Sequence, residues 1–147
     1  MAGPTSDNLI TTTDGVLDVL RKSRRVAIIG IKPETHAMRP AHYVPKYLQD
    51  AGYELVPVPV YYPEVTTILG ERVYRSLEDV PGHIDLVVVF RRSPDVAKHV
   101  DEVLAKRPDA VWLQAGIRND AAAAAWAQAG IRVVQDRCTM VEHRRLE

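Results

Sequence analysis

The sequence has few of the features that mark a chain for export, for a membrane or for nucleic acid. Cys138 is the only cysteine, which excludes an intrachain disulfide and favours a reducing, cytoplasmic setting. Residues 1–13 lack the apolar core of a signal peptide, and the longest apolar runs, such as 86–90, are far too short to span a bilayer. Nineteen basic residues balance nineteen acidic ones, so no global positive field favours nucleic acid or a membrane surface. Any anion must therefore be held by a local site.

The glycine pattern G-x-G-x-x-G is missing as well, which argues against a standard nicotinamide dinucleotide site. Instead, the apolar run Val26–Ile29 breaks at Gly30, and a polar loop leads into a segment with helical periodicity at 40–51. At such a strand–turn–helix junction, backbone N–H groups and the positive end of the helix dipole favour phosphate. Because Lys32 and Arg39 lie in this loop, we predict a phosphate site here. The alternative is a tight turn with solvated charges.

Apolar runs alternate with helical or turn segments along the chain. The predicted strands are 26–29, 54–60, 73–74, 85–90, 110–114 and 131–134, and the predicted helices are 14–23, 40–50, 94–106 and 119–129, with Ser93 capping the third. Each strand–helix unit spans roughly 25–30 residues, the size of a βαβ unit, and right-handed crossovers between such units give a doubly wound sheet. We therefore expect one α/β domain over 13–147 with a mainly parallel, five- to six-stranded sheet. Residues 1–12 are expected to form a flexible tail, and those from Asp136 onward a second tail.

Two further loops follow strong strands and should open at the same edge of the sheet. Phe90, Arg91 and Arg92 follow one strand, where an arginine could serve a phosphate or stack on a base; a solvated rim is the alternative. Gln114, Ala115 and Gly116 follow the next strand, where a glycine allows close approach of a ligand to the backbone; a plain turn is the alternative.

The order and spacing of these motifs resemble one family. The matching pieces are VAIIG at 26–30, RPA at 39–41, AGY at 51–53, LGE at 69–71, VYRSL at 73–77, FRR at 90–92, VWLQAG at 111–116, and DRC at 136–138 with Glu142-His143. Together they resemble the small stand-alone CoA-binding proteins with a Rossmann-type fold, which are similar to the CoA-binding domain of the succinyl-CoA synthetase alpha subunit. The resemblance covers nearly the whole chain after the N-terminal segment.

The resemblance implies that coenzyme A or an acyl-CoA lies across the strand ends. The pyrophosphate would sit over Gly30–Lys32 and the helix start at Pro40, with adenine and ribose phosphate near Val58–Tyr61 and Phe90–Arg92. No catalytic residue and no metal ligand is implied. The implied cofactor-binding residues are Gly30, Ile31, Lys32, Pro33, Arg39, Pro40, His42, Val58, Pro59, Val60, Tyr61, Phe90, Arg91, Arg92, Gln114, Ala115 and Gly116.

The chain departs from the family pattern after the second strand. The family tends to have Val-Asn-Pro followed by a basic residue, whereas this chain has Val58-Pro59-Val60-Tyr61. A contact to the 3′-phosphate of CoA would then have to come from Lys32, Arg39 or Arg91. Lys32 also stands where the family more often has a small hydroxyl residue.

The function implied by the resemblance is binding of CoA without catalysis by this chain alone, in a carrier, sensor or subunit role, with a possible second copy or protein partner. One alternative is a small NAD(P)-linked enzyme or a thiol-dependent acyl transferase. Another is a protein-interaction module whose nucleotide crevice is vestigial. Cys138 and His143 are five positions apart and do not share a helix face well, so Cys138 is interpreted as a small packed residue rather than a nucleophile. A mixed disulfide between Cys138 and the CoA thiol is the weaker alternative.

Overall fold

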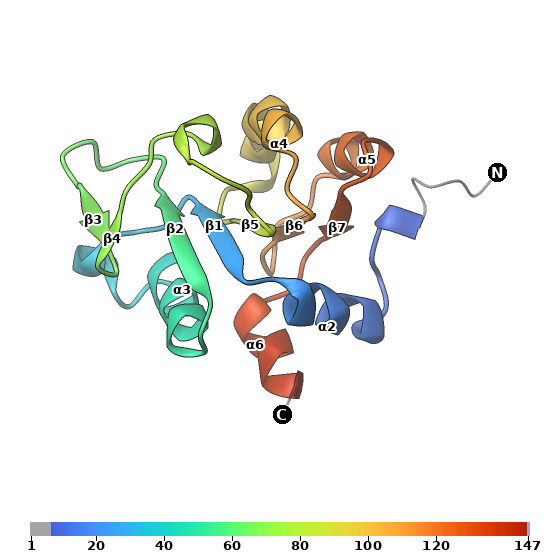
Figure 1. Ribbon diagram of the computed structural model, residues 1–147, viewed down its shortest axis with the longest axis horizontal. Helices are drawn as coiled ribbons and strands as arrows, with labels where there is room; N and C mark the ends of the chain where they lie inside the picture. Colours follow the sequence, from blue (N-terminus) through green and yellow to red (C-terminus); the bar gives the residue numbers. More distant parts are fainter. Residues whose placement is uncertain (1–6, 147) are drawn as a thin grey trace.

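A five-stranded parallel sheet forms the centre of the molecule in the computed structural model, which describes residues 7–146 (Figure 1). The strands lie in the order β2-β1-β5-β6-β7. β1 pairs with β2 on one side and with β5 on the other, so the chain winds outward in both directions from β1. The doubly wound α/β fold is therefore confirmed. The strand bounds are β1 Arg25–Ile29, β2 Glu54–Val58, β5 Leu86–Val89, β6 Ala110–Leu113 and β7 Arg132–Val134.

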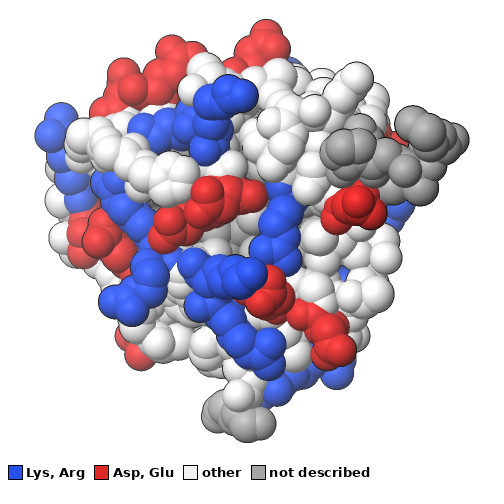
Figure 2. All heavy atoms as spheres, turned by 45° about the vertical axis from the view of Figure 1, so that its right-hand side comes forward, with Lys and Arg blue, Asp and Glu red and all other residues white. Residues whose placement is uncertain are grey.

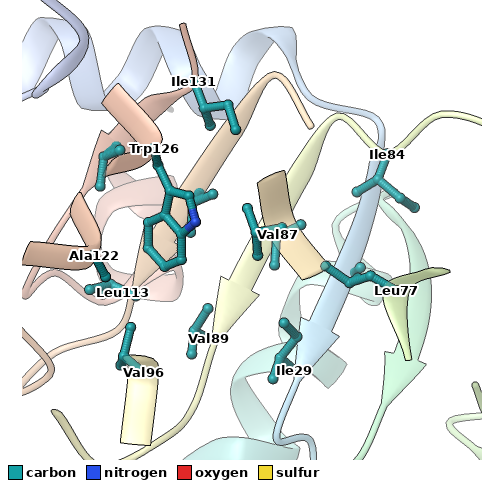
Figure 3. Packing of buried hydrophobic residues seen from close by; sticks show 14 of the residues in the cluster. Ile29, Leu77, Ile84, Val87, Val89, Val96, Leu113, Ala122, Trp126 and Ile131 are labelled. Carbon is teal, nitrogen blue, oxygen red and sulfur yellow. The ribbon is translucent and has the colours of Figure 1, made fainter. Parts of the chain in front are cut away.

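The two faces of the sheet carry two separate apolar clusters, because successive side chains of a strand point to opposite faces. Val87 and Leu113 pack with Trp126 on one face, where Figure 3 shows the indole lying over the strands. Ile28 and Trp112 pack on the other face. All residues of β5 and β6 are buried, as expected for strands covered on both sides.

Helices cover both faces of the sheet in Figure 1. α2, α3 and α6 lie on one face, and α4 and α5 lie on the other. Among the residues that the structure describes, no helix combines the length and apolar character needed to cross a membrane. The bounds are α2 Thr13–Lys22, α3 Pro40–Asp50, α4 Val100–Lys106, α5 Asp120–Gln128 and α6 Thr139–His143, with 3-10 turns η1 Glu34–His36, η2 Leu77–Asp79, η3 Ser93–His99 and η4 Arg144–Leu146.

The predicted continuous helix over 94–106 is wrong in its first half. η3 is a 3-10 helix, and the α-helix begins only at Val100. Ser93 does not cap it, because its Oγ accepts a hydrogen bond from the Arg118 backbone N–H at 3.0 Å. The Ser93 carbonyl also accepts from Asn119 Nδ2 at 3.1 Å. This serine thus ties the loop after β5 to the loop after β6.

The predicted tail from Asp136 is also wrong over its described part. α6 packs against α2 and α3, and η4 packs against α6. Glu142 is 5% exposed, and its carboxylate pairs with Arg137 at 3.1 Å and Arg145 at 3.3 Å. The helix is only five residues long, too short for a 3.6-residue period to show in the sequence.

The predicted flexible tail over 1–12 divides into two parts. Residues 1–6 lie outside the described residues. Leu9 forms a parallel bridge to Val133, and the Ile10 backbone N–H donates to the Val133 carbonyl at 2.8 Å. Asn8 Nδ2 donates to the Ala127 carbonyl at 2.9 Å. The segment from Asn8 therefore covers the open edge of β7, and the packed domain begins earlier than residue 13.

The opposite edge of the sheet is covered by a small hairpin. Instead of a strand at 73–74, β3 Thr67–Ile68 and β4 Glu71–Arg72 form a separate antiparallel pair. β2 ends at Val58, because prolines interrupt it, and its edge is protected where Tyr74 N–H donates to the Pro57 carbonyl at 2.9 Å.

Charge is mixed on the face of the molecule that Figure 2 presents. Figure 2 shows lysine and arginine side chains interspersed with aspartate and glutamate on the face that it presents. This view agrees with the balanced composition of nineteen basic and nineteen acidic residues.

Candidate functional site

A cleft lies at the carboxyl ends of β1 and β5, the two neighbouring strands between which the winding direction of the chain reverses. In open α/β sheets, this switch in winding direction leaves a crevice in which ligands bind. The hollow has a volume of about 270 Å³. We call it the switch-point cleft; it is lined by Gly30, Ile31, Lys32, Ala41, Val60, Tyr61, Tyr62, Phe90, Arg91, Arg92 and Asp95.

Gly30 is required at the floor of the cleft for two reasons. Its φ of +83° lies in the left-handed region that favours glycine. A Cβ at this position would also lie 2.1 Å from the Phe90 carbonyl oxygen. Its N–H donates to the Val58 carbonyl at 2.9 Å, so the ends of β1, β2 and β5 converge at this residue.

The loop after Gly30 is fastened to the first turn of α3. The Lys32 N–H donates to the Ala41 carbonyl at 3.1 Å. That carbonyl lies four residues before Pro45, whose missing N–H leaves it free to accept. The Lys32 carbonyl lies 2.8 Å from His42 Nδ1, and His42 is 3% exposed. Both backbone groups of Lys32 are thus hydrogen-bonded to α3, and its side chain lines the cleft.

Tyr62 is a cleft residue that the sequence interpretation missed. Its hydroxyl accepts from Lys32 Nζ at 3.2 Å, and the ammonium lies 5.6 Å from its ring centroid. Arg75 fixes this loop by donating to the carbonyls of Tyr61 at 3.1 Å and Tyr62 at 2.8 Å. Further bonds from Arg75 reach Pro63 and Val65. The pair of adjacent tyrosines was the one sequence signal that could have indicated Tyr62.

Arg91 is positioned by a chain of hydrogen bonds that starts beneath the cleft. Its Nε donates to His99 Nε2 at 3.1 Å, and His99 Nδ1 lies 2.5 Å from Glu102 Oε1. Because Nε2 accepts from Arg91, this network assigns the ring proton to Nδ1, which donates to Glu102. The other end of the guanidinium reaches Tyr61, with Nη1 3.4 Å from the hydroxyl and Cζ 5.9 Å from the ring centroid.

Glu102 anchors this chain as a carboxylate. Burial alone would raise the pKa of Glu102, but hydrogen bonds from His99 and the Leu77 N–H outweigh it, so the pKa lies below its ordinary value of 4.5. The Leu77 N–H and the Ser76 hydroxyl donate to Oε2 at 3.0 and 3.2 Å.

Arg92, the next residue in the chain, also lines the cleft and is paired within its own segment. Its Nε lies 3.2 Å from Asp95 Oδ2, and Lys98 lies 3.3 Å from the other carboxylate oxygen. The bond from Arg92, followed by that from Lys98, lowers the pKa of Asp95. The side chain of Arg92 is 81% exposed, so it can leave Asp95 for an anion at little cost.

A second hollow of about 290 Å³ adjoins the cleft. It lies between the first turns of α3, the end of β6 and the start of α6, and Phe90 lines both hollows. Gln114 ties its walls together, because Oε1 accepts from the Thr139 N–H at 2.9 Å. We call it the apolar pocket; it is lined by Pro40, Tyr43, Val44, Phe90, Gln114, Ala115, Ile117, Cys138, Met140 and Val141.

Most of the predicted site residues line one of the two hollows, and the others line neither. Eight line the switch-point cleft, namely Gly30, Ile31, Lys32, Val60, Tyr61, Phe90, Arg91 and Arg92. The apolar pocket takes Pro40, Gln114 and Ala115, and shares Phe90 with the cleft. The predicted residues that line neither hollow are Pro33, Arg39, His42, Val58, Pro59 and Gly116. Beside Tyr62, the sequence interpretation missed Ala41, Asp95 and the pocket residues Tyr43, Val44, Ile117, Cys138, Met140 and Val141.

The fold and the cleft define a class of protein: a doubly wound α/β domain with basic side chains at its switch point, where this architecture binds ligands. A family model described as CoA binding domain matches residues 24–144. The chain therefore belongs to the CoA-binding domain family.

Relatives cover nearly the full length of the chain. A structure from Thermus thermophilus is 40% identical with a TM-score of 0.84, covering 93% of this chain and 100% of that one. A hypothetical protein from Pyrococcus horikoshii is 31% identical with a TM-score of 0.83, covering 92% of each chain. The uncharacterized protein YneT of Bacillus subtilis (strain 168) is 34% identical over 128 residues, which are 87% of this chain and 91% of that protein.

Proposed function

We propose that this chain binds coenzyme A in the switch-point cleft and acts as a non-catalytic carrier, sensor or subunit. The observation that carries the proposal is the gathering of Lys32, Arg91 and Arg92 at the switch point of a domain from the CoA-binding family. CoA is a polyanion, and charge-assisted bonds from lysine and arginine are the strong contacts available to its phosphates. The pyrophosphate lies beside Lys32, where the loop is held against α3.

Arg91 supplies the contact to the 3′-phosphate in this proposal. The basic residue typical of the family after the second strand is absent, and Tyr61 stands in that stretch. The Arg91 guanidinium lies against Tyr61 from the neighbouring loop and so brings a positive charge to the same place. Tyr61 is 63% exposed, and its ring stacks on the adenine in this proposal.

The positions of Cys138 and His143, the candidate nucleophile and base, support the non-catalytic role. Cys138 lies in the apolar pocket. His143 is committed elsewhere, with Nδ1 2.9 Å from the Tyr47 hydroxyl and its ring against Tyr47 and Tyr53. A nucleophile needs its base within hydrogen-bond reach, and no hydrogen bond joins these two side chains in the described part of the chain.

Calorimetric titration of wild type and Arg91→Ala with CoA and dephospho-CoA tests the assignment. We expect the variant to bind CoA about 1.5–3 kcal/mol more weakly, the range for hydrogen bonds to charged groups. Its affinity for dephospho-CoA should stay close to that of wild type, because the lost contact is to the 3′-phosphate.

Arg21→Ala is the matched control, since Arg21 is an exposed arginine in the last turn of α2, distant in the fold from the cleft. It should leave both affinities unchanged. Equal weakening of CoA and dephospho-CoA by Arg91→Ala would refute the 3′-phosphate role, and an unchanged CoA affinity would remove Arg91 from the site.

A further inference from the structure

We propose that the apolar pocket binds the acyl group of an acyl-CoA thioester, so that the chain prefers short acyl-CoA over free CoA. The inference rests on the proposed function, because it assumes that the CoA phosphates lie in the switch-point cleft.

The two hollows are neighbours along one edge of the sheet. Phe90 lines both of them. The consecutive residues Pro40 and Ala41, at the start of α3, line the pocket and the cleft respectively. A ligand with its phosphates beside Lys32 therefore needs only to pass Phe90 for its thiol end to enter the pocket.

The pocket differs from the cleft in its chemistry. The cleft is lined by three basic side chains and Asp95, whereas no lysine, arginine, histidine, aspartate or glutamate lines the pocket among the described residues. Tyr43 and Val141 on its wall are 41% and 45% exposed. Of the four large apolar side chains exposed in the described chain, Tyr43, Tyr61 and Val141 line one of the two hollows, and Met38 lines neither. Apolar surface left open in this way beside a ligand cleft indicates a part of the ligand that is itself apolar.

Gln114 supplies a polar group suited to a thioester. This residue is 4% exposed, and its Oε1 is occupied by the Thr139 N–H. That bond identifies the other terminal atom as the NH₂ group, for which the described residues provide no acceptor. A donor without a protein acceptor on a residue that lines an apolar pocket matches a ligand carbonyl, and the thioester carbonyl lies where the CoA thiol meets its acyl group.

The size of the pocket selects short chains. Its volume of about 290 Å³ corresponds to the liquid volume of roughly ten water molecules. Each buried methylene contributes about a fourfold gain in affinity. An acyl-CoA with a four-carbon acyl group should therefore bind roughly tenfold or more tightly than free CoA. The gain in affinity should level off for longer acyl chains.

Titration of the wild-type protein with CoA, acetyl-CoA, butyryl-CoA and palmitoyl-CoA tests the inference. We expect affinity to rise from CoA to butyryl-CoA and to gain little more at palmitoyl-CoA. Ala115→Leu fills the pocket from an exposed position and should bring butyryl-CoA down to the affinity of CoA. Ala121→Leu is the matched control on α5, because Ala121 is also exposed but lines neither hollow; it should keep the full preference.

Cys138 provides an independent readout, because it lies in the same pocket. Bound butyryl-CoA should slow the reaction of this thiol with a maleimide more than bound CoA does. If CoA binds but butyryl-CoA binds no more tightly and protects Cys138 no better, the acyl pocket is refuted while the proposed function stands. If CoA itself does not bind, the proposed function fails and the inference fails with it.

Discussion

At the scale of single residues, several groups near the cleft hold its loop in place. Both backbone groups of Lys32 are bonded to α3, and His42 is buried beneath the loop. Both residues were predicted as ligand contacts, Lys32 because a basic residue after a glycine turn is typical of phosphate sites. The sequence does not reveal that Pro45 leaves the Ala41 carbonyl free to hold the loop, since this depends on how the loop folds back on α3.

Gly30 is the residue whose replacement should damage the domain most directly. Gly30→Ala would place a methyl group on the Phe90 carbonyl and strain a left-handed backbone, so we expect a loss of about 2–4 kcal/mol in unfolding free energy. Chemical denaturation measures this. Gly130→Ala is the control, because Gly130 also has a positive φ, +89°, but its added methyl group would meet no atom within 4 Å beyond its chain neighbours. Gly130→Ala should lower the unfolding free energy by only about 1–2 kcal/mol. Equal losses at both positions would show that the contact with Phe90 is unimportant.

Glu102 should make stability depend on pH in the acid range. Its folded-state pKa lies below the ordinary value of 4.5, so its contribution to stability is complete above that value and is lost as pH falls through the folded pKa. Glu102→Gln should flatten this part of the curve of unfolding free energy against pH. The control is Glu64→Gln, at an exposed carboxylate. Parallel curves for wild type and Glu102→Gln would contradict the role of Glu102 beneath Arg91.

At the scale of elements, the strands were predictable and the short helices were not. The apolar runs that predict β1, β5 and β6 are buried on both faces, so their pattern is strong and local. The buried carboxylate of Glu142 in α6 pairs with two arginines close to it in the chain, and Ser93 at the start of η3 accepts hydrogen bonds from the loop after β6. These contacts join segments that are distant in sequence or too short for periodicity, so sequence alone could not reveal them.

The local ion pairs around α6 can be tested through Glu142. Glu142→Gln removes the charge from a side chain that is 6% exposed and pairs with Arg137 and Arg145. We expect the unfolding free energy to fall by about 1–3 kcal/mol. Glu71→Gln, at an exposed position on β4, is the matched control and should change it little. An unchanged denaturation midpoint for Glu142→Gln would mean that these ion pairs do not stabilise the C-terminal segment.

At the scale of the whole molecule, the winding of the chain explains why the basic and apolar hollows are neighbours. The switch between β1 and β5 opens the cleft, and the next strand outward, β6, ends beside the apolar pocket. The meeting of three loops at one edge was predictable from the sequence, because parallel strands end together. The pocket was not predictable, because its far wall is α6, the segment expected to be a tail.

Binding of CoA at the switch point is the property on which the proposed function depends. The most direct measurement is isothermal titration of the purified wild-type protein with CoA, with NAD and NADP as controls. We expect saturable binding of CoA at one site per chain and no comparable binding of either dinucleotide. Tight binding of NAD or NADP would favour a dinucleotide enzyme, and the absence of heat with all three would contradict the account and leave the cleft vestigial.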